Sequence, residues 1–590
     1  MNLKRLIALC FVIVFAVSIA GCGDGKSPSV GENGITICVG PNPETIDPAL
    51  NSAVDGAIII QNAFSGLYTY GFDSAGEVAL VPECAEKIVE PTALGDGRYQ
   101  YVLTLREGLK WSDGKEIKAS DFTYSWNRAA SPDTGADYQY MFDVIDGYDE
   151  EAPKLNITAD DAARTITVVT TSYCPYFDQL LAFPTYFPVR EDMVKAHGDS
   201  WTTKPESYIS NGPFKMSEWT VGDKIVMVKN EHYWDAENVK LDKVSFALSD
   251  DNDAIFANYE NGTYDFIDDP LITQIGVLKN DPKRMDVDFF IKPNIGTYYL
   301  VFNVDVSFKP GIGTASSSAE AWQNWTTEQN AKARYAMGLL IDRSYIVDEV
   351  TQAGEQEAFG FVPTGMDHGT GTEFRSKAPK WWNPTSHEAN VKEAIQMLKD
   401  LGYEYDEASG KFTNFPSFAY HYNDNVNNAS IFTAVQDMWA DYGISITSNV
   451  GTWDVYTTAL QNGEHTVGRI GWIADYNDPI NFLEIFISGG GNNYARIGKS
   501  GAIGGGAYFG ENKNQKWSEV YDTVVAQIKT ETDPAARAEL MYKAESILKE
   551  HYLQIPIYYY TNTYMAKENL QGYIYNELGT LFLKGAYLEK

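Results

Sequence analysis

From residue 468 to residue 479 the chain reads GRIGWIADYNDP. The apolar run from Val467 to Ala474 predicts a buried strand, and the turn formers at 477–479 end it. Ligands of open α/β sheets bind just beyond the carboxyl ends of strands, so Asp475 is placed where a bound molecule can reach it. The structural alternative is that Asp475 caps the helix that follows the turn.

Seven further segments carry short motifs. They read ETIDP at 44–48, LREGLKWSDG at 105–114, DFTYSW at 121–126, SNGPF at 210–214, NEHYW at 230–234, LIDR at 340–343 and IPIYYY at 555–560. Together with residues 468–479 they resemble the periplasmic oligopeptide-binding proteins, the peptide-capturing subunits of ABC importers. The matches follow the family order from about Ile35 to Lys590, so a chance match to one short pattern does not explain them.

The resemblance implies an anchor for each end of an extended peptide. Asp475 is expected to hold the free α-ammonium group. Arg469 is expected to meet the carboxylate of a peptide of suitable length, because a guanidinium binds a carboxylate through a paired hydrogen-bond fork. An ion pair with another acid of this acidic chain is the alternative for Arg469.

Between these anchors the resemblance implies that the peptide adds as a strand. Its backbone would bond to two short segments, Ser52, Ala53 and Val54 on one lobe and Gly471, Trp472 and Ile473 on the other. Backbone pairing ignores sequence, so the protein is expected to accept varied peptides.

Aromatic residues stand at several family positions that line the peptide groove, where rings give rigid walls with polar tips. They are Trp453, Trp472, Tyr560 and Tyr124, and packing in the core is the alternative for each. Asn428 stands about where some relatives carry an assisting histidine, and Ser52 about where they carry an acid. These departures leave the preferred peptide length and charge open.

The resemblance also supplies the expected fold, an α/β, two-lobed periplasmic-binding-protein fold of class II (cluster C) with an additional inserted domain. Domain I would consist of residues 34–66, 187–296 and 561–590, and domain II would be an insertion at 67–186. Domain III, residues 297–560, would close against domain I across a hinge of two crossing segments.

Local patterns predict several elements of this fold. A helix with a capping box at Thr385 and Glu388 is expected to end at Gly402. A second helix, through Ile431 and Trp439, is followed by a strand at 444–446. Asp533 with Pro534 is typical of a helix start. The acids at 250, 251 and 253 lack the glycine and glutamate of a calcium loop, so capping of the next helix is the better interpretation.

The N-terminus has the pattern of a lipoprotein signal: two cations, an apolar run from Leu6 to Val17, and Ile19-Ala20-Gly21-Cys22. We expect residues 1–21 to be removed, Cys22 to carry lipid, and residues 22–33 to form a flexible tether. An uncleaved membrane anchor is the alternative. Either arrangement places the protein outside the cytoplasm, in a periplasm or on the outer face of the cell membrane.

Charge excludes one class of partner. The formal net charge is -34, and removal of Lys4 and Arg5 with the signal makes it -36. Nucleic acid binding requires a basic surface, so nucleic acid is excluded. Beyond the signal and Cys22, the domain map that the resemblance implies places Cys84 and Cys174 in one domain, which makes them the expected pair if a disulfide forms. Three small buried thiols are the alternative that we favour.

Motifs for catalysis were not found. The chain has no Gly-x-Ser-x-Gly elbow, no His-Glu-x-x-His, no Cys-x-x-Cys and no phosphate loop, and its seven histidines are scattered. We therefore expect no enzyme activity, no cofactor and no metal. The predicted function is that of a monomeric, lipid-anchored receptor that captures short peptides and delivers them to an ABC permease. The alternatives are the same fold with a dipeptide, nickel chelate, haem or oligosaccharide as ligand, and an exported hydrolase.

Overall fold

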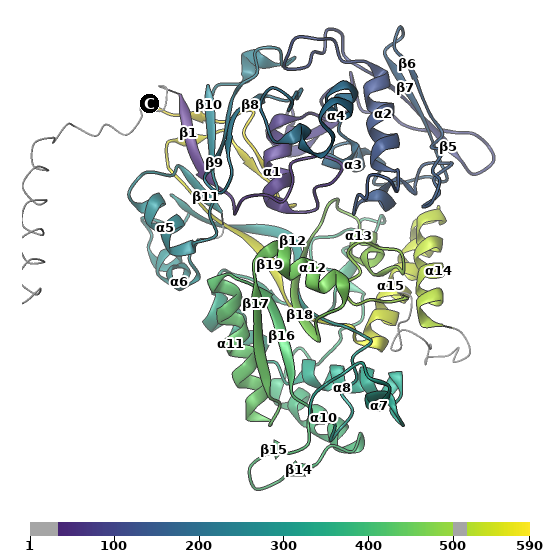
Figure 1. The fold of residues 1–590 in the computed structure, drawn as a ribbon, viewed down its shortest axis with the longest axis vertical. Coiled ribbons are helices and arrows are strands. Elements are labelled where there is room, and N and C mark those ends of the chain that lie inside the picture. Colours follow the sequence, from purple (N-terminus) through teal and green to yellow (C-terminus); the bar gives the residue numbers. More distant parts are fainter. Residues whose placement is uncertain (1–32, 269, 499–515) are drawn as a thin grey trace, which may run out of the picture.

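The computed structural model describes residues 33–268, 270–498 and 516–590. Its strands and helices form two lobes joined by two long strands, β12 (Phe289–Phe302) and β19 (Gln554–Ala566), which cross the middle of the molecule (Figure 1). The expected two-lobed α/β fold is confirmed. The predicted signal, the lipid site Cys22 and nearly all of the tether lie outside the described residues.

One mixed sheet of 11 strands runs through both lobes in the order β17-β16-β18-β12-β19-β11-β1-β10-β9-β8, with β13 paired to β19. Its remaining strands are β1 (Gly34–Cys38), β8 (Phe214–Thr220), β9 (Lys224–Lys229), β10 (Lys243–Ala247), β11 (Phe266–Asp268), β13 (Gln356–Glu357), β16 (Phe418–Asn423), β17 (Ile446–Gly451) and β18 (Val467–Ile473). The pairing of β12 with β19 shifts register between Pro293 and Thr297. Such an irregularity bends a strand pair, and it coincides with the domain boundary that we propose between residues 296 and 297.

The chain between residues 67 and 186 builds structure of its own. A hairpin of β2 (Tyr68–Phe72) and β3 (Val78–Pro82) precedes a four-stranded sheet in the order β4-β5-β7-β6. The strands of that sheet are β4 (Thr92–Ala93), β5 (Tyr99–Thr104), β6 (Ile157–Asp160) and β7 (Thr165–Thr170), with helices α2 (Ala119–Ala129) and α3 (Phe177–Leu180). We propose this segment as the inserted domain II.

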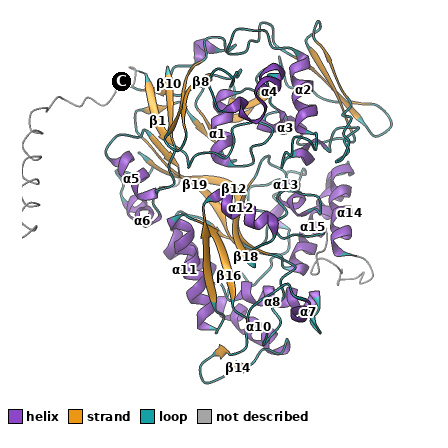
Figure 2. Cartoon of the chain, in the orientation of Figure 1, coloured by secondary structure: helices purple, strands orange, loops and turns teal. Residues whose placement is uncertain are grey.

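Helices lie beside the strands in both lobes (Figure 2). Before β12 they are α1 (Val54–Ala63), α4 (Glu191–His197), α5 (Asn252–Glu260) and α6 (Ile272–Asn280). After β12 they are α7 (Ala319–Trp322), α8 (Thr327–Leu339), α9 (Arg343–Tyr345), α10 (His387–Asp400), α11 (Val426–Asp441), α12 (Trp453–Asn462), α13 (Ile480–Leu483), α14 (Trp517–Thr530) and α15 (Pro534–His551). Short strand pairs complete the fold: β14 (Tyr405–Asp406) with β15 (Lys411–Phe412), β20 (Leu570–Gln571) with β23 (Tyr587–Leu588), and β21 (Ile574–Tyr575) with β22 (Leu581–Phe582).

Most local predictions are confirmed. Strand β18 covers the predicted buried run, helix α15 starts at Pro534, and the Asp533 carboxylate accepts a hydrogen bond from the Ala536 amide at 2.8 Å. The carboxylate of Asp251 accepts from the Ala254 amide at 3.0 Å, so this acid caps α5 as expected.

Two boundary predictions are wrong. Helix α10 is capped by Ser386, whose hydroxyl accepts from the Ala389 amide at 3.1 Å, because Thr385 is already bonded to Asn383. Strand β17 starts at Ile446, two residues later than predicted. The amide of Ile444 donates to the Trp439 carbonyl and so still belongs to the turn that ends α11.

The core is continuous through both lobes and includes large side chains that are almost fully buried. Among them are Trp111, Trp126, Trp201, Trp381, Trp439 and Trp517. The thiols of Cys38, Cys84 and Cys174 are buried and free, which confirms the interpretation as three small buried thiols. No helix among the described residues has the length and apolar character needed to cross a membrane.

Candidate ligand-binding cavity

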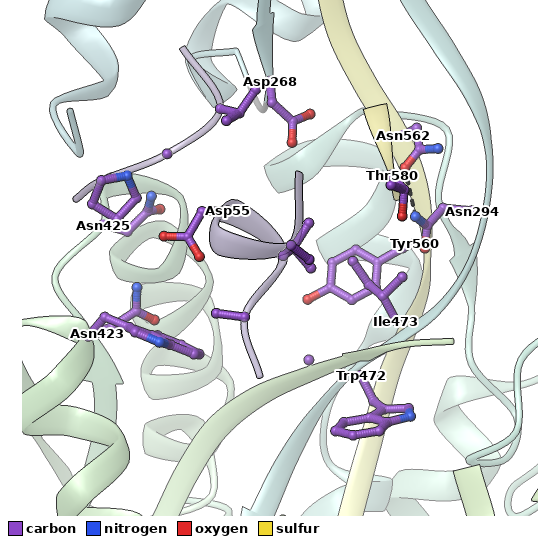
Figure 3. A pocket seen from close by; sticks show the side chains of 18 of the residues that line it. Asp55, Asp268, Asn294, Asn423, Asn425, Trp472, Ile473, Tyr560, Asn562 and Thr580 are labelled. Atoms are coloured by element: carbon purple, nitrogen blue, oxygen red, sulfur yellow. Dashed lines mark hydrogen bonds between the residues drawn. The ribbon is translucent and has the colours of Figure 1, made fainter. Parts of the chain in front are cut away.

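A cavity of about 950 Å³ lies between the two lobes. That volume falls in the range of small-molecule sites, about 300 to 1,000 Å³. The segment before α1 lines one wall, and β18 and β19 line the opposite wall (Figure 3). All but one of the predicted site residues line this cavity: Ser52, Ala53, Val54, Asn428, Trp453, Arg469, Gly471, Trp472, Ile473, Asp475 and Tyr560.

Tyr124 is the exception, and its predicted place in the groove is wrong. It lies on α2, which packs beside α4 in the lobe that contains α1, here called the first lobe, and its charged neighbours include Arg128, Glu191 and Lys195. The matched motif predicted the segment but not the surroundings of Tyr124, which is not among the residues that line the cavity.

Strand β18 offers part of one edge to the cavity. Its neighbour β16 pairs with only its first two residues, Val467 and Gly468. The Ala474 amide donates to the Ile295 carbonyl at 2.8 Å, which fixes the phase of the antiparallel ladder with β12. Because backbone groups of alternate residues point to opposite edges, those of Gly471 and Ile473 point away from β12. An added strand needs this geometry.

Gly471 leaves room for the Tyr560 ring in the cavity wall formed by β18 and β19. A Cβ atom there would lie 2.3 Å from the Tyr560 hydroxyl oxygen, so only glycine leaves room for the ring in its observed position. The Tyr560 ring packs edge-on against Tyr298 and Tyr558, with centroids at 6.2 and 5.4 Å. Such edge-to-face pairs hold the ring rigidly at the cavity surface.

Asp475 follows β18 and is partly exposed to the cavity. Its Oδ1 accepts a hydrogen bond from the Tyr138 hydroxyl at 3.1 Å, and its Oδ2 accepts from Asn481 Nδ2 at 2.9 Å. Asn481 in turn accepts from the Asp475 amide and from Trp472 Nε1, at 3.1 and 3.0 Å. Asp475 is therefore held in place by neutral donors, and no cation in the described part of the chain pairs with it.

Burial raises the pKa of Asp475 to about 7, and the nearby Glu484 adds to the rise, while the bonds from Asn481 and Tyr138 oppose it. A carboxylate without a cation in such a place is costly, and a ligand ammonium would relieve the cost. The capping alternative is wrong, because Asp478, not Asp475, accepts from the Ile480 amide, at 3.0 Å, where α13 begins.

Arg469 stands on β18, six residues before Asp475, which follows the strand. Its Nη1 donates to Asn423 Oδ1 at 3.1 Å, and its guanidinium carbon lies 4.9 Å from the centre of the Tyr298 ring. Its Nε has no hydrogen-bond partner, and no carboxylate of residues 33–268, 270–498 or 516–590 pairs with it. The alternative of an ion pair with another acid of the chain is therefore wrong for this part of the protein.

The segment 52–54 lines the opposite wall with a shorter extended part than expected. Ala53 has extended backbone angles, φ -121° and ψ 148°, but Val54 is the first residue of α1. The extended part is thus limited to Ser52 and Ala53. Val54 lines the cavity from the first helical position, where its amide has no acceptor within the helix, and its bond to a peptide stays a prediction. Ser52 donates to Asp137 Oδ2 at 2.8 Å, which ties this wall to the segment 67–186.

The remaining predicted residues contribute walls and polar links. Trp472 is only 7% exposed, so most of its ring is core and only an edge faces the ligand space. Asn428 Oδ1 accepts from the Tyr298 hydroxyl at 3.3 Å, and its Nδ2 donates to Asn423 Oδ1 at 2.9 Å. Among the described residues, no group of three or more His, Cys, Asp or Glu side chains is arranged to hold a metal ion.

Sequence patterns missed three residues of this site. Tyr138 reaches Asp475 from 337 positions earlier in the chain and has no local signal. Asn481 follows the Asn-Asp-Pro turn and was overlooked because it resembles an ordinary helix residue. Asp55 stands in the first turn of α1 and lines the cavity.

The comparisons with known proteins assign the class. Residues 79–494 match the model of the bacterial extracellular solute-binding proteins, family 5, and the chain belongs to that family. It is similar to the oligopeptide-binding protein OppA of Bacillus subtilis, with 30% identity over 99% of this chain and all of that protein.

Two solved structures differ in how well they match. One is OppA of Haemophilus influenzae in complex with RPPGFSPFR, which has a TM-score of 0.76 and 25% identity and covers 94% of this chain and 99% of its own. The other is the unliganded open form of the murein tripeptide binding protein MppA, with a TM-score of 0.61 and 27% identity, covering 94% and 97%. The lower score against the open form indicates that the lobes of this protein are closed.

Proposed function

We propose that this protein captures short peptides in an extended conformation and delivers them to an ABC permease. The proposal depends on one observation. Asp475 and Arg469 both line the cavity without an ion-pair partner among the described residues, and the edge of β18 between them is not paired with another strand. Six residues of strand span roughly 20 Å, so a peptide bonded at both ends would have about five or six residues. The relatives described above, which include a peptide complex, support this class of ligand.

Closure of the lobes over the peptide is part of the proposal. The rings of Tyr176 and Tyr476 stack across the lobes at 4.5 Å and an angle of 5°. Lys529 Nζ lies 2.5 Å from Asp143 of the first lobe and 2.7 Å from Glu484 of the second. These contacts would have to separate when the lobes open, so they favour the closed form, which a permease could recognise as loaded.

The role of the peptide amine gives the direct test. Short peptides with a free amino terminus should raise the melting temperature of the mature protein, because a ligand that binds only the folded state stabilises it, by about 2.7 kcal/mol at a concentration of 100 Kd. The N-acetylated forms should raise it much less, since acetylation removes the charge that meets Asp475. Equal increases in melting temperature for both forms, measured by thermal denaturation, would show that Asp475 does not bind the peptide ammonium.

Recovery of the peptide separates a receptor from a hydrolase. After incubation with the protein, the peptide should be returned with its mass unchanged. Appearance of cleavage products that a washed blank does not give would favour the enzyme.

Anchoring through a lipid on Cys22 completes the proposal, supported by the short apolar run and the small residues before this cysteine. Cys22→Ala should abolish labelling of the precursor by a radioactive fatty acid and increase its soluble fraction. Label retained by the variant would place the anchor elsewhere.

A further inference from the structure

The wall of the cavity is strongly acidic. Among the described residues that line it there is a single basic side chain, Arg469, against eight acids. The acids are Glu44, Asp55, Asp250, Asp268, Glu355, Asp424, Asp454 and Asp475. One peptide ammonium would neutralise only one of them, so a ligand that carries additional positive charge fits this wall better than a neutral one.

Asp55 differs from the other acids of the wall. It lies in the first turn of α1, and its carboxylate points to the side of the cavity where Asn423 and Asn425 of the opposite lobe lie (Figure 3). Its Oδ1 accepts a hydrogen bond from the neighbouring Gly56 amide at 2.8 Å. No Lys, Arg or His in the described part of the chain forms an ion pair with it, and Arg469 does not reach it.

Five of the other acids, all but Asp475 and Glu355, have less to offer a ligand. Asp268 accepts a hydrogen bond from the Tyr575 hydroxyl at 2.8 Å, and Asp454 accepts from the Thr452 hydroxyl at 2.6 Å. Glu44, Asp250 and Asp424 are exposed at the rim, where solvent screens their charge. Asp55 is only partly exposed, and burial, with a contribution from Glu44, raises its pKa to about 6.

A helix start offers a structural reason for an acid at this position, because the helix dipole stabilises a first-turn carboxylate. That reason would hold equally on an exposed helix, as for Asp253 in the first turn of α5. It does not explain why the Asp55 carboxylate faces a ligand cavity whose described lining has a single basic side chain, Arg469. Asp55 can stabilise the start of α1 and also bind a charged ligand. Only the second role predicts that Asp55 affects which peptides bind.

We propose that Asp55 selects peptides with a basic side chain, lysine or arginine, and that this protein prefers cationic peptides. This inference rests on the proposed function. An extended peptide beside β18 sends alternate side chains to opposite faces, and a basic side chain is long enough to reach a carboxylate beside the peptide, so the position of the basic residue should matter. Attraction between the two charges in a partly buried site, reduced by the cost of desolvating them, should give a net preference of about tenfold to a hundredfold.

The experiment compares pairs of alanine-based pentapeptides with free amino termini. Each pair carries either lysine or norleucine at one position, which is moved along the peptide, so that length and apolar stem are matched. Calorimetric titration of the wild type should give about tenfold to a hundredfold tighter binding of the lysine peptide for at least one position. Asp55→Asn should bring that ratio close to one.

Two further variants sharpen the result. Asp253→Asn, which removes a first-turn acid outside the cavity, should keep the lysine preference. Asp55→Lys should reverse it in favour of glutamate at the same position. Equal affinity for lysine and norleucine in the wild type, or an unchanged ratio in Asp55→Asn, would overturn the inference and leave peptide capture intact. Failure of every peptide to bind would instead refute the proposed function, and the inference with it.

Discussion

Asp475→Ala should weaken the binding of a free-amine peptide by roughly a hundredfold to several thousandfold. The peptide ammonium, enclosed between the lobes, would lose its only proposed counterion, and an uncompensated buried charge costs roughly 3 to 5 kcal/mol. Tyr138 and Asn481 remain in place, but a hydroxyl and an amide cannot neutralise the ammonium. Calorimetric titration of both proteins with the same peptide measures the loss.

The empty Asp475→Ala variant should fold normally. The pKa of about 7 lies above the ordinary value of 3.8, so this carboxyl favours the folded state only while it is protonated. Its contribution is present below the unfolded pKa and is lost as the pH rises towards 7. Above pH 7 its removal should therefore leave the melting temperature unchanged or raise it. Normal affinity in a clearly destabilised variant would contradict the assignment.

The same pKa sets the direction of the pH dependence of binding in the wild type. Below pH 7 the peptide ammonium must displace a proton from Asp475, so affinity falls by up to about tenfold per pH unit. Between pH 7.5 and pH 5.5 we expect a fall of roughly ten- to thirtyfold, which Asp475→Ala should not show.

Asp478→Ala should have the opposite pattern, a large loss of stability with little loss of affinity. Asp478 is 4% exposed and accepts from both terminal nitrogens of Arg537, at 2.7 and 3.0 Å, and it also bonds the Ile480 amide. Removal of one partner of a buried pair leaves the other charge uncompensated, at a cost of roughly 3 to 5 kcal/mol in the free energy of unfolding. Denaturant unfolding measures it.

Asp478 does not line the cavity, so the folded fraction of Asp478→Ala should bind peptide with near-normal affinity. The two acids stand three residues apart in one turn and provide a matched pair. If both variants lost stability and neither lost affinity, the division of this turn into a ligand-binding and a structural acid would be wrong.

Periodic burial made much of the fold predictable. Helices α10, α11 and α15 each bury one face, and most of strand β18 is buried. Buried faces leave apolar residues at regular spacing, which the sequence shows. Helix ends were less predictable, because either of two neighbouring hydroxyls, Thr385 and Ser386, could cap α10, and the bond of Thr385 to Asn383 leaves Ser386 as the cap.

The site was predictable where it lies on one segment, as Arg469 and Asp475 do on and after β18. It was not predictable where distant segments meet. The contact of Tyr138 with Asp475 exists only because the lobes close, and the sequence around Tyr138 has no periodic or motif signal for it. Asp55 resembles an ordinary first-turn acid in the sequence, and only the cavity distinguishes it.

The most direct measurement of the central claim, that Asp475 holds the peptide ammonium, is a cycle of four calorimetric titrations. Wild type and Asp475→Ala are each titrated with one pentapeptide in its free-amine form and its N-acetylated form. If the ammonium and Asp475 interact, acetylation should cost the wild type roughly a hundredfold or more and cost the variant less than about threefold. Equal losses on acetylation in the two proteins would show that the amine and Asp475 act independently, and would contradict the account.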